Sequence, residues 1–303
     1  MVIKLPPESI VIRPPIEAYS ILIPITGGCS WNKCKFCGTY KGVYSDGIQE
    51  YAIRPKENVF KDIDYYANNN YRGFSVFLAG GNPTSAPTDY LVEIIRYIRE
   101  RLKDVSRISS YAKALDILRK SDEELKSLAN AGLDIVYMGL ESGSSKILRI
   151  MKKGTNAESM IKAGKKTLKA GIKLSLYVIL GLGSYKDSEE HVKETAKVLT
   201  EINPTIFRFR TLNILPNTPL WHEWKSGEFE LLKPIDCLKE ERTIIANLGP
   251  NVYSEVYNDH VSNYCTFEST NIKEDRQAFL NVLDSLINDP KIQNLPRKNL
   301  TFM

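Results

Sequence analysis

Three cysteines stand within nine residues near the start of this 303-residue chain. Cys29, Cys34 and Cys37 follow the spacing Cys-x4-Cys-x2-Cys, whereas Cys237 and Cys265 stand alone. Thiolates this close together can bind three irons of a cubane [4Fe–4S] cluster and leave the fourth iron open to a substrate or cofactor. An odd number of cysteines with this clustering does not suggest a disulfide framework, so we expect a reducing compartment.

A structural zinc site is the alternative interpretation of the cysteine loop. Structural zinc takes four protein ligands, and the three histidines, His191, His222 and His260, are distant in the sequence. Cys237 or Cys265 could still supply a fourth ligand through folding. A ferredoxin that only carries electrons would normally saturate its cluster with cysteines. The loop therefore favours an iron–sulfur centre with an open iron and leaves zinc as an alternative.

The composition excludes few classes of function. The net charge is +5, from 41 basic and 36 acidic residues; it gives no strong nucleic-acid signal but permits an anionic substrate. Residues 1–15 contain no apolar run of the kind that a signal peptide needs. No segment approaches the roughly 18 consecutive apolar residues of a membrane span. We expect a cytoplasmic protein without a membrane span.

Short apolar runs alternate with helical patterns from about residue 20 to residue 212. The expected strands are 21–25, 74–78, 107–111, 134–139, 173–180 and 205–213. The expected helices are 57–69, 91–102, one that begins at Ser121, 144–150, 156–170 and 188–202. This alternation predicts parallel βαβ units, and thus an α/β fold: a partial (β/α)6 TIM-type barrel with parallel strands. A reversal of strand order, as in a doubly wound sheet, stays open.

The pattern divides the chain into three parts. Residues 1–18 form an N-terminal lead-in, 19–215 the core barrel, and 216–303 a mostly helical C-terminal extension that we expect to cover the barrel. The clearest helix of the extension is expected at 275–287. Barrels of parallel strands place their chemistry at the carboxyl ends of the strands. The cysteine loop directly follows the first strand and therefore lies at that end.

This loop, with Phe36 before its last cysteine, resembles that of the radical S-adenosylmethionine (SAM) superfamily. The family most often has Cys-x3-Cys-x2-Cys, so this chain carries one residue more between Cys29 and Cys34. The resemblance implies an enzyme with a [4Fe–4S] cluster whose open iron binds SAM. It also implies reductive cleavage of SAM to a 5′-deoxyadenosyl radical that abstracts hydrogen from an unknown substrate. A reducing electron donor, flavodoxin-like or ferredoxin-like, is implied as the partner.

Several later motifs fit the same resemblance. Gly80, Gly81 and Asn82 resemble the family's Gly-rich motif, whose backbone approaches the methionine ammonium of SAM. Glu141 lies in a Gly-x-Glu-Ser-Gly motif, which implies hydrogen bonds from the ribose hydroxyls or the ammonium. Lys153 resembles a basic residue that pairs with the SAM carboxylate. An ordinary turn, an N-capped helix and a solvated lysine pair are the respective alternatives.

Polar residues on the last two core strands complete the candidate site. Alternation along 173–180 could place Ser175 in the barrel near SAM. Arg208 shares its parity with Arg210 in an otherwise apolar strand, and buried charge needs a partner. We therefore predict that Arg208 contacts SAM or an anionic substrate. His260 and Tyr264 lie in a stretch that resembles one of other radical SAM proteins, and they could serve proton or hydrogen-atom chemistry; a structural histidine is the alternative.

Two classes of function follow. The first is a radical SAM enzyme of unknown substrate. No second cysteine cluster exists in the sequence, which disfavours subclasses with an auxiliary cluster. The second is a non-catalytic zinc-binding or iron–sulfur-binding module that interacts with RNA through its positive charge.

Overall fold

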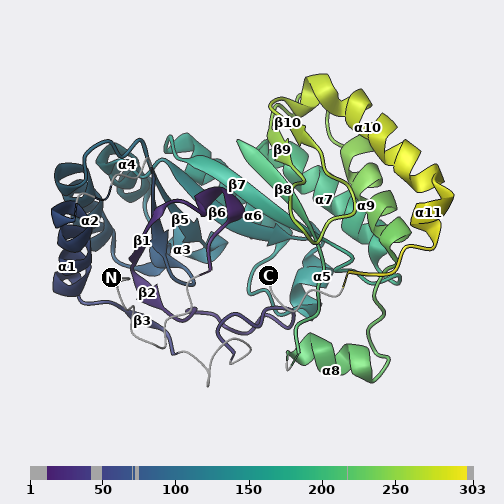
Figure 1. Ribbon diagram of the computed structural model, residues 1–303, viewed down its shortest axis with the longest axis horizontal. Coiled ribbons are helices and arrows are strands. Elements are labelled where there is room, and N and C mark those ends of the chain that lie inside the picture. The colour runs from purple at the N-terminus through teal and green to yellow at the C-terminus, as the bar shows by residue number, and fades with distance from the viewer. Residues whose placement is uncertain (1–11, 42–49, 70, 72–74, 217, 299–303) are drawn as a thin grey trace. The chain divides into compact units, whose positions relative to one another are not determined.

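A mostly parallel sheet organises the chain. The computed structural model describes residues 12–41, 50–69, 71, 75–216 and 218–298. The main sheet consists, in spatial order, of β1 (Ile21–Pro24), β4 (Ser75–Ala79), β5 (Arg107–Ala112), β6 (Ile135–Glu141), β7 (Lys173–Leu180), β8 (Ile206–Thr211), β9 (Glu255–Tyr257) and β10 (Glu268–Ser269) (Figure 1). The pairs β1–β4, β4–β5, β5–β6, β7–β8 and β8–β9 are parallel, and β9–β10 is antiparallel. Within the described residues β1 and β10 end the sheet, so the barrel is not closed.

Helices follow most of these strands, as parallel connections require. They are α1 (Lys56–Asn68), α2 (Thr88–Arg101), α3 (Ala114–Arg119), α4 (Asp122–Ala131), α5 (Ser145–Ile150), α6 (Ala157–Lys169), α7 (Ser188–Ile202), α8 (Pro219–Lys225), α9 (Pro234–Ala246), α10 (Ile272–Asn288) and α11 (Pro290–Gln293), with short 3-10 turns at Pro15–Glu17 and Pro83–Ser85. The α/β fold with six parallel core strands is confirmed. In the described ranges, every helix is too short or too polar to span a bilayer.

Local sequence explains why these helices form where they do. The Ser121 side chain accepts a hydrogen bond from the Glu124 amide, and the Glu124 carboxylate accepts one from the Ser121 amide, so a capping box starts α4. Gly132 ends α4 at a φ of 109°, a conformation that glycine adopts without strain. Helix α2 buries one apolar stripe, which contains Leu91 and Ile98. Both helices match their predicted positions.

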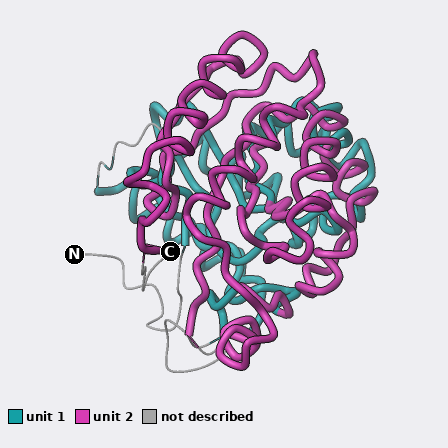
Figure 2. The backbone as a smooth tube through the Cα atoms, turned by 90° about the vertical axis from the view of Figure 1, so that its right-hand side faces the viewer, with its two compact units in different colours: residues 1–32, 37–138, 165–174 teal, residues 33–36, 139–164, 175–303 magenta. Residues whose placement is uncertain are grey.

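The chain divides into two compact units (Figure 2). Unit 1 contains residues 1–32, 37–138 and 165–174, and unit 2 contains 33–36, 139–164 and 175–303. Strands β6 and β7 and helix α6 each have residues in both units. The predicted boundary between a core and an extension at residue 215 stays a prediction, as does the covering role of the extension.

Two strands after residue 216 extend the sheet, which the sequence did not predict. Val256 of β9 pairs with Phe207 of β8, and Ser269 of β10 pairs with Val256. The predicted helix 275–287 is present as α10, which packs on α9. The Phe267 and Phe279 rings stack with centroids 4.0 Å apart and attach the β10 segment to α10.

Candidate active site

The cysteine loop begins where β1 ends. After Pro24 the chain forms β2 (Thr26–Gly27), which pairs antiparallel with β3 (Ala52–Ile53), and Cys29 follows two residues later. Within the described residues, Cys29, Cys34 and Cys37 form no disulfide, and all three are partly exposed. Burial, and then the charges of Cys29 and Cys37, raise the pKa of Tyr40 above its usual range. Those two thiols therefore lie near the same phenol.

The residues of the loop fit an iron–sulfur centre. No three His, Cys, Asp or Glu side chains in the described part of the chain are already gathered as metal ligands. The donor set is nevertheless three thiols on nine consecutive residues, a chain short enough for them to converge on one cluster. Thiolates are the ligands that iron–sulfur clusters take. Three of them leave one iron without a protein ligand.

Two glycines at the carboxyl end of β4 allow the strand to approach this loop. A Cβ on Gly81 would lie 2.4 Å from the Gly28 oxygen and 2.7 Å from the Cys29 Cα, and the Gly81 amide donates to Gly28 O at 3.1 Å. A Cβ on Gly80, whose φ is 127°, would lie 2.2 Å from the Thr26 Oγ1. Any larger side chain here would displace the loop. The sequence predicted close approach to SAM at these glycines; their approach to the cysteine loop was missed.

Asn82 holds the loop through its whole side-chain amide. Its Oδ1 accepts from the Ser30 amide at 3.0 Å, and its Nδ2 donates to Ser30 Oγ at 2.9 Å and to Asp116 Oδ2 at 2.7 Å. Lys113 Nζ also donates to Ser30 Oγ, at 2.7 Å. Asn82 and Asp116 are buried. Ser30 lies in the longer Cys29–Cys34 interval, so these side chains fix the part of the loop that departs from the usual spacing.

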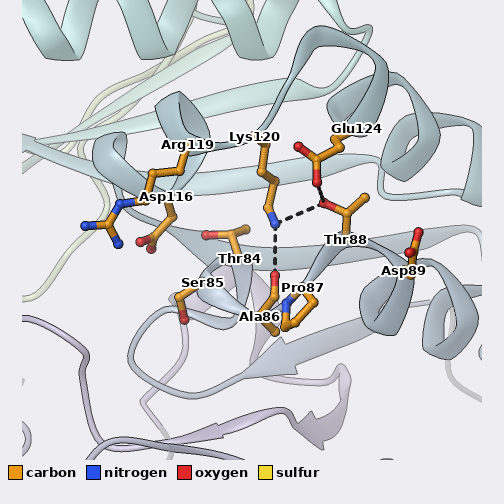
Figure 3. A pocket seen from close by; sticks show the side chains of 10 residues that line it. All are labelled: Thr84, Ser85, Ala86, Pro87, Thr88, Asp89, Asp116, Arg119, Lys120 and Glu124. Atoms are coloured by element: carbon orange, nitrogen blue, oxygen red, sulfur yellow. Dashed lines mark hydrogen bonds between the residues drawn. The ribbon is translucent and has the colours of Figure 1, made fainter.

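Asp116 also lines a polar pocket of about 300 Å³ (Figure 3). Lys120 donates to Ala86 O at 2.9 Å and to Thr88 Oγ1 at 3.2 Å, and Thr88 donates to Glu124 at 2.7 Å. Burial lowers the pKa of Lys120. These hydrogen bonds between residues that line the pocket connect α2 with α4 and with the end of α3.

Glu141 and Lys153 form a partly buried ion pair at the end of β6. The Lys153 ammonium donates to Glu141 Oε1, and it lies 6.0 Å from the centre of the Phe36 ring. A Cβ on Gly139 would lie 1.9 Å from Glu141 Oε1, so only glycine leaves room for the carboxylate. Glu141 has a φ of 64°. This left-handed conformation costs a glutamate about 1–3 kcal/mol, and such strain clusters at functional sites.

Arg208 lies in a row of side chains across three strands. Tyr177 of β7 is paired with Arg208 of β8, which is paired with Tyr257 of β9. The Arg208 guanidinium lies 4.4 Å from the Tyr257 ring centre and 3.2 Å from Asp259 Oδ1. Arg208 is 3% exposed, and its Nε has no hydrogen-bond partner among the described residues. The fully buried Ser175 Oγ, on the same face, also has none within the described chain.

Arg210 contacts His260 and helps to lower its pKa. Its guanidinium lies 2.8 Å from His260 Nε2 and 5.0 Å from the Tyr177 ring centre. Because arginine can only donate, Nε2 accepts in this contact. Nδ1 lies 2.7 Å from Ser262 Oγ and accepts from the Ser262 amide at 3.2 Å. Burial, followed by the Arg210 charge, lowers the pKa of His260 to about 4.

Tyr264 contacts Lys298, near the end of the described chain. Its hydroxyl accepts from the Lys298 amide at 3.1 Å, and the Lys298 ammonium lies 5.3 Å from the ring centre. Lys298 also donates to Val261 O at 2.9 Å. These contacts attach the end of the described chain to the 259–264 segment.

A buried polar group on α7 and α9 was missed by the sequence reasoning. Glu240 accepts from the Gly181 amide at 2.6 Å and from Ser188 Oγ at 2.6 Å, and burial raises its pKa to about 7. His191 is fully buried, with Nδ1 2.8 Å from Ser142 Oγ and Nε2 3.9 Å from Glu240. Burial lowers the pKa of His191 to about 4. These groups support the loop that follows β7.

Comparison with known proteins identifies the family. The model of the radical SAM superfamily matches residues 23–199, which is more than half of the chain. An uncharacterised protein of Methanocaldococcus jannaschii, MJ0486, is 26% identical over 240 residues, which cover 78% of this chain and 74% of that protein. Biotin synthase of Clostridioides difficile is 24% identical over 228 residues, which cover 75% of this chain but only 64% of the synthase.

Solved structures agree on the fold. Methylornithine synthase superposes with a TM-score of 0.54 at 14% identity, covering 87% of this chain and 68% of the synthase. A radical SAM methyltransferase of Kitasatospora setae with bound cobalamin and [4Fe–4S] cluster superposes with a TM-score of 0.53 at 18% identity, covering 68% of this chain and 40% of that protein. The prediction of an enzyme is confirmed over that of a non-catalytic module, and so are its cofactors. The chain belongs to the radical SAM superfamily, enzymes that use a [4Fe–4S] cluster and SAM.

Proposed function

We propose that Cys29, Cys34 and Cys37 hold the [4Fe–4S] cluster of this enzyme. When bound, the cluster and SAM supply a 5′-deoxyadenosyl radical that takes a hydrogen atom from a substrate. The observation that carries the proposal is the contact between Gly81 and Cys29, where a Cβ would lie 2.8 Å from the Cys29 Cβ. A strand end without side chains leaves space for the loop and a small cofactor at the face where such folds place chemistry.

Glu141 and Lys153 are proposed to bind the polar groups of SAM. The strained φ of 64° at Glu141 directs its carboxylate to the lysine ammonium. Such a pair offers an acceptor for hydroxyl or ammonium donors and a cation for a carboxylate. Its side chains are 10% and 18% exposed, so ligands would meet a largely desolvated pair. We propose that Gly80, Gly81 and Asn82 act by positioning the loop as well as by approaching SAM.

Ser175 and Arg208 are proposed to bind a further polar group of SAM or of an anionic substrate. Support comes from two buried polar atoms, Ser175 Oγ and Arg208 Nε, that have no partner within the described residues. A buried polar atom without a partner costs about 1–3 kcal/mol, which a ligand would recover. The substrate itself stays unknown.

His260 and Tyr264 remain proposals for proton or hydrogen-atom chemistry. The Nε2 of His260 is engaged by Arg210, so proton transfer at this atom would require that contact to open. Tyr264 would have to act while its hydroxyl accepts from Lys298. Replacement of either residue should slow substrate turnover but leave SAM cleavage intact.

Cluster assembly tests the ligand assignment. The protein would be reconstituted anaerobically with iron and sulfide, and both elements counted per chain. We expect four irons and four sulfides for the wild type, in the [4Fe–4S] cubane of this family. Cys34→Ala should lose the cluster, whereas Cys265→Ala, a buried cysteine outside the loop, should retain it. A cluster that survives Cys34→Ala would refute the assignment.

A further inference from the structure

Residue Lys35, between Cys34 and Cys37, joins two helices of unit 2 to the cysteine loop. The Lys35 amide donates to Met151 O at 3.0 Å, just after α5, and Lys35 O accepts from the Leu220 amide at 3.1 Å, in α8. The Lys35 ammonium pairs with Glu223 of α8 at 2.6 Å. Both helices therefore lie beside Lys33–Phe36, the part of the cysteine loop that belongs to unit 2.

The exposed residues of these elements and of the positions beside them include four cations and two large apolar side chains. We call them the α5–α8 face: Lys33, Arg149, Ile150, Lys152, Trp224 and Lys225. Ile150 is 40% and Trp224 37% exposed. Lys225 lies 4.7 Å from the Trp224 ring centre and 5.6 Å from that of Trp221. Large exposed apolar side chains bordered by charge mark protein interaction sites, and Trp and Arg are enriched in them.

Helix α8 and the turn after it carry few acidic residues. Glu223, the only acidic residue of α8, is paired with Lys35. Glu228, in the turn after α8, is the next exposed carboxylate along the chain. No ion pair in the described chain involves Arg149 or Lys225. Helix α8 has seven residues and is about 10 Å long, so Lys225 lies close to the loop.

We propose that the α5–α8 face docks the acidic one-electron carrier protein that reduces the enzyme, an inference that rests on the proposed function. Each cleavage of the C5′–S bond of SAM consumes one electron and releases methionine, so a carrier must lose one electron per cleavage. Electron transfer is efficient only over short distances, and this face adjoins the cysteine loop. Redox encounters use small interfaces, below about 1,200 Å², and charge complementarity raises their association rate.

The test compares protein and chemical reductants. Arg149→Glu/Lys225→Glu reverses two charges of the face. We expect at least a tenfold weaker Kd for oxidised flavodoxin at low ionic strength, a difference that shrinks as salt screens the charges. Formation of 5′-deoxyadenosine driven by flavodoxin, its reductase and NADPH should fall by a similar factor. The rate with dithionite, a small reductant that needs no docking, should not change.

Two controls complete the design. Lys162→Glu/Lys239→Glu reverses two exposed lysines of α6 and α9 in the same unit and should bind flavodoxin like the wild type. Arg149→Lys/Lys225→Arg keeps the charge and should keep the affinity. Equal flavodoxin binding by the charge-reversed and wild-type proteins would overturn the inference.

The remaining outcomes are also decisive. A wild type that binds neither flavodoxin nor an acidic ferredoxin at low ionic strength overturns the inference as well. Absence of 5′-deoxyadenosine with dithionite refutes the proposed function, whereas the Kd comparison still decides the docking face.

Discussion

At the scale of the residue, the most informative side chains are those that the sequence motifs did not connect. The Gly-rich motif was assigned to SAM, but its Asn82 bonds to Ser30 of the cysteine loop and to Asp116 of α3. Asp116 lies 34 positions from Asn82 and belongs to no motif. A sequence pattern reveals residues of the right type at the right spacing, whereas partners distant in sequence become visible only in the fold.

Asn82→Asp tests this contact with minimal change of shape. The new carboxylate would face Asp116, whose Oδ2 lies 2.7 Å from the present Nδ2, and like charges at this distance repel. We expect a loss of cluster content of at least twofold after reconstitution, measured as iron per chain. Asn82→Asp combined with Asp116→Asn should restore it, because one carboxylate and one amide are again present. Cluster content unaffected by Asn82→Asp would show that the contact does not hold the loop.

Glu141→Gln tests whether Glu141 binds SAM, with little change in the shape of the side chain. The amide keeps the shape of the carboxylate but not its charge, so the pair with Lys153 is lost. We expect about a tenfold weaker Kd for SAM, the loss of one charge-assisted hydrogen bond, measured by calorimetry on the reconstituted protein. Lys162→Gln, at an exposed position of α6, is the control and should bind SAM normally. Equal SAM affinity in the Glu141 and control variants would remove Glu141 from the site.

At the scale of the element, the six core strands were predictable because most are apolar runs and all alternate with helical patterns, whereas the later elements carried weaker signals. Strands β9 and β10 have three and two residues and no apolar run. Helix α9 buries Glu240 and Glu241 on its core-facing side, and these carboxyls interrupt the apolar stripe by which a helix is recognised. Helix α3 has only six residues. These elements therefore depend on tertiary packing, which the local sequence pattern does not reveal.

The buried carboxyl of Glu241 makes stability depend on pH. Burial raises its pKa from 4.5 to about 8, and Asn258 Nδ2 donates to it. The folded protein therefore holds this proton more tightly than the unfolded chain. The stabilisation is complete below about pH 4.5 and is lost as the pH rises through about 8. Cys265, whose pKa burial raises to about 12, stays neutral across this range.

Glu241→Gln should remove this dependence, since a glutamine mimics the protonated acid. We expect the variant to match the wild type at pH 5 and to exceed its free energy of unfolding at pH 9 by on the order of 3 kcal/mol. Urea unfolding followed by circular dichroism measures the difference. Glu228→Gln, at an exposed position, should show no such gain. A gain of the same size at pH 5 and pH 9 would contradict the assignment to Glu241.

At the scale of the whole molecule, the family and the fold were predictable from one loop and its place after the first strand. The family model covers residues 23–199, which contain the cysteines, the Gly-rich motif and Glu141. Arg208, His260 and Tyr264 lie outside that range, so their roles rest on this chain alone. The substrate is not encoded in the shared part, since relatives with this core include biotin synthase and a tRNA-modifying enzyme.

Formation of 5′-deoxyadenosine tests the central claim most directly. Anaerobically reconstituted protein would be mixed with SAM and dithionite, and the products separated by liquid chromatography with mass detection. The account predicts 5′-deoxyadenosine and methionine in equal amounts from the wild type and from Cys265→Ala, and none from Cys34→Ala. A wild type that carries a complete [4Fe–4S] cluster and yet yields no 5′-deoxyadenosine would contradict it.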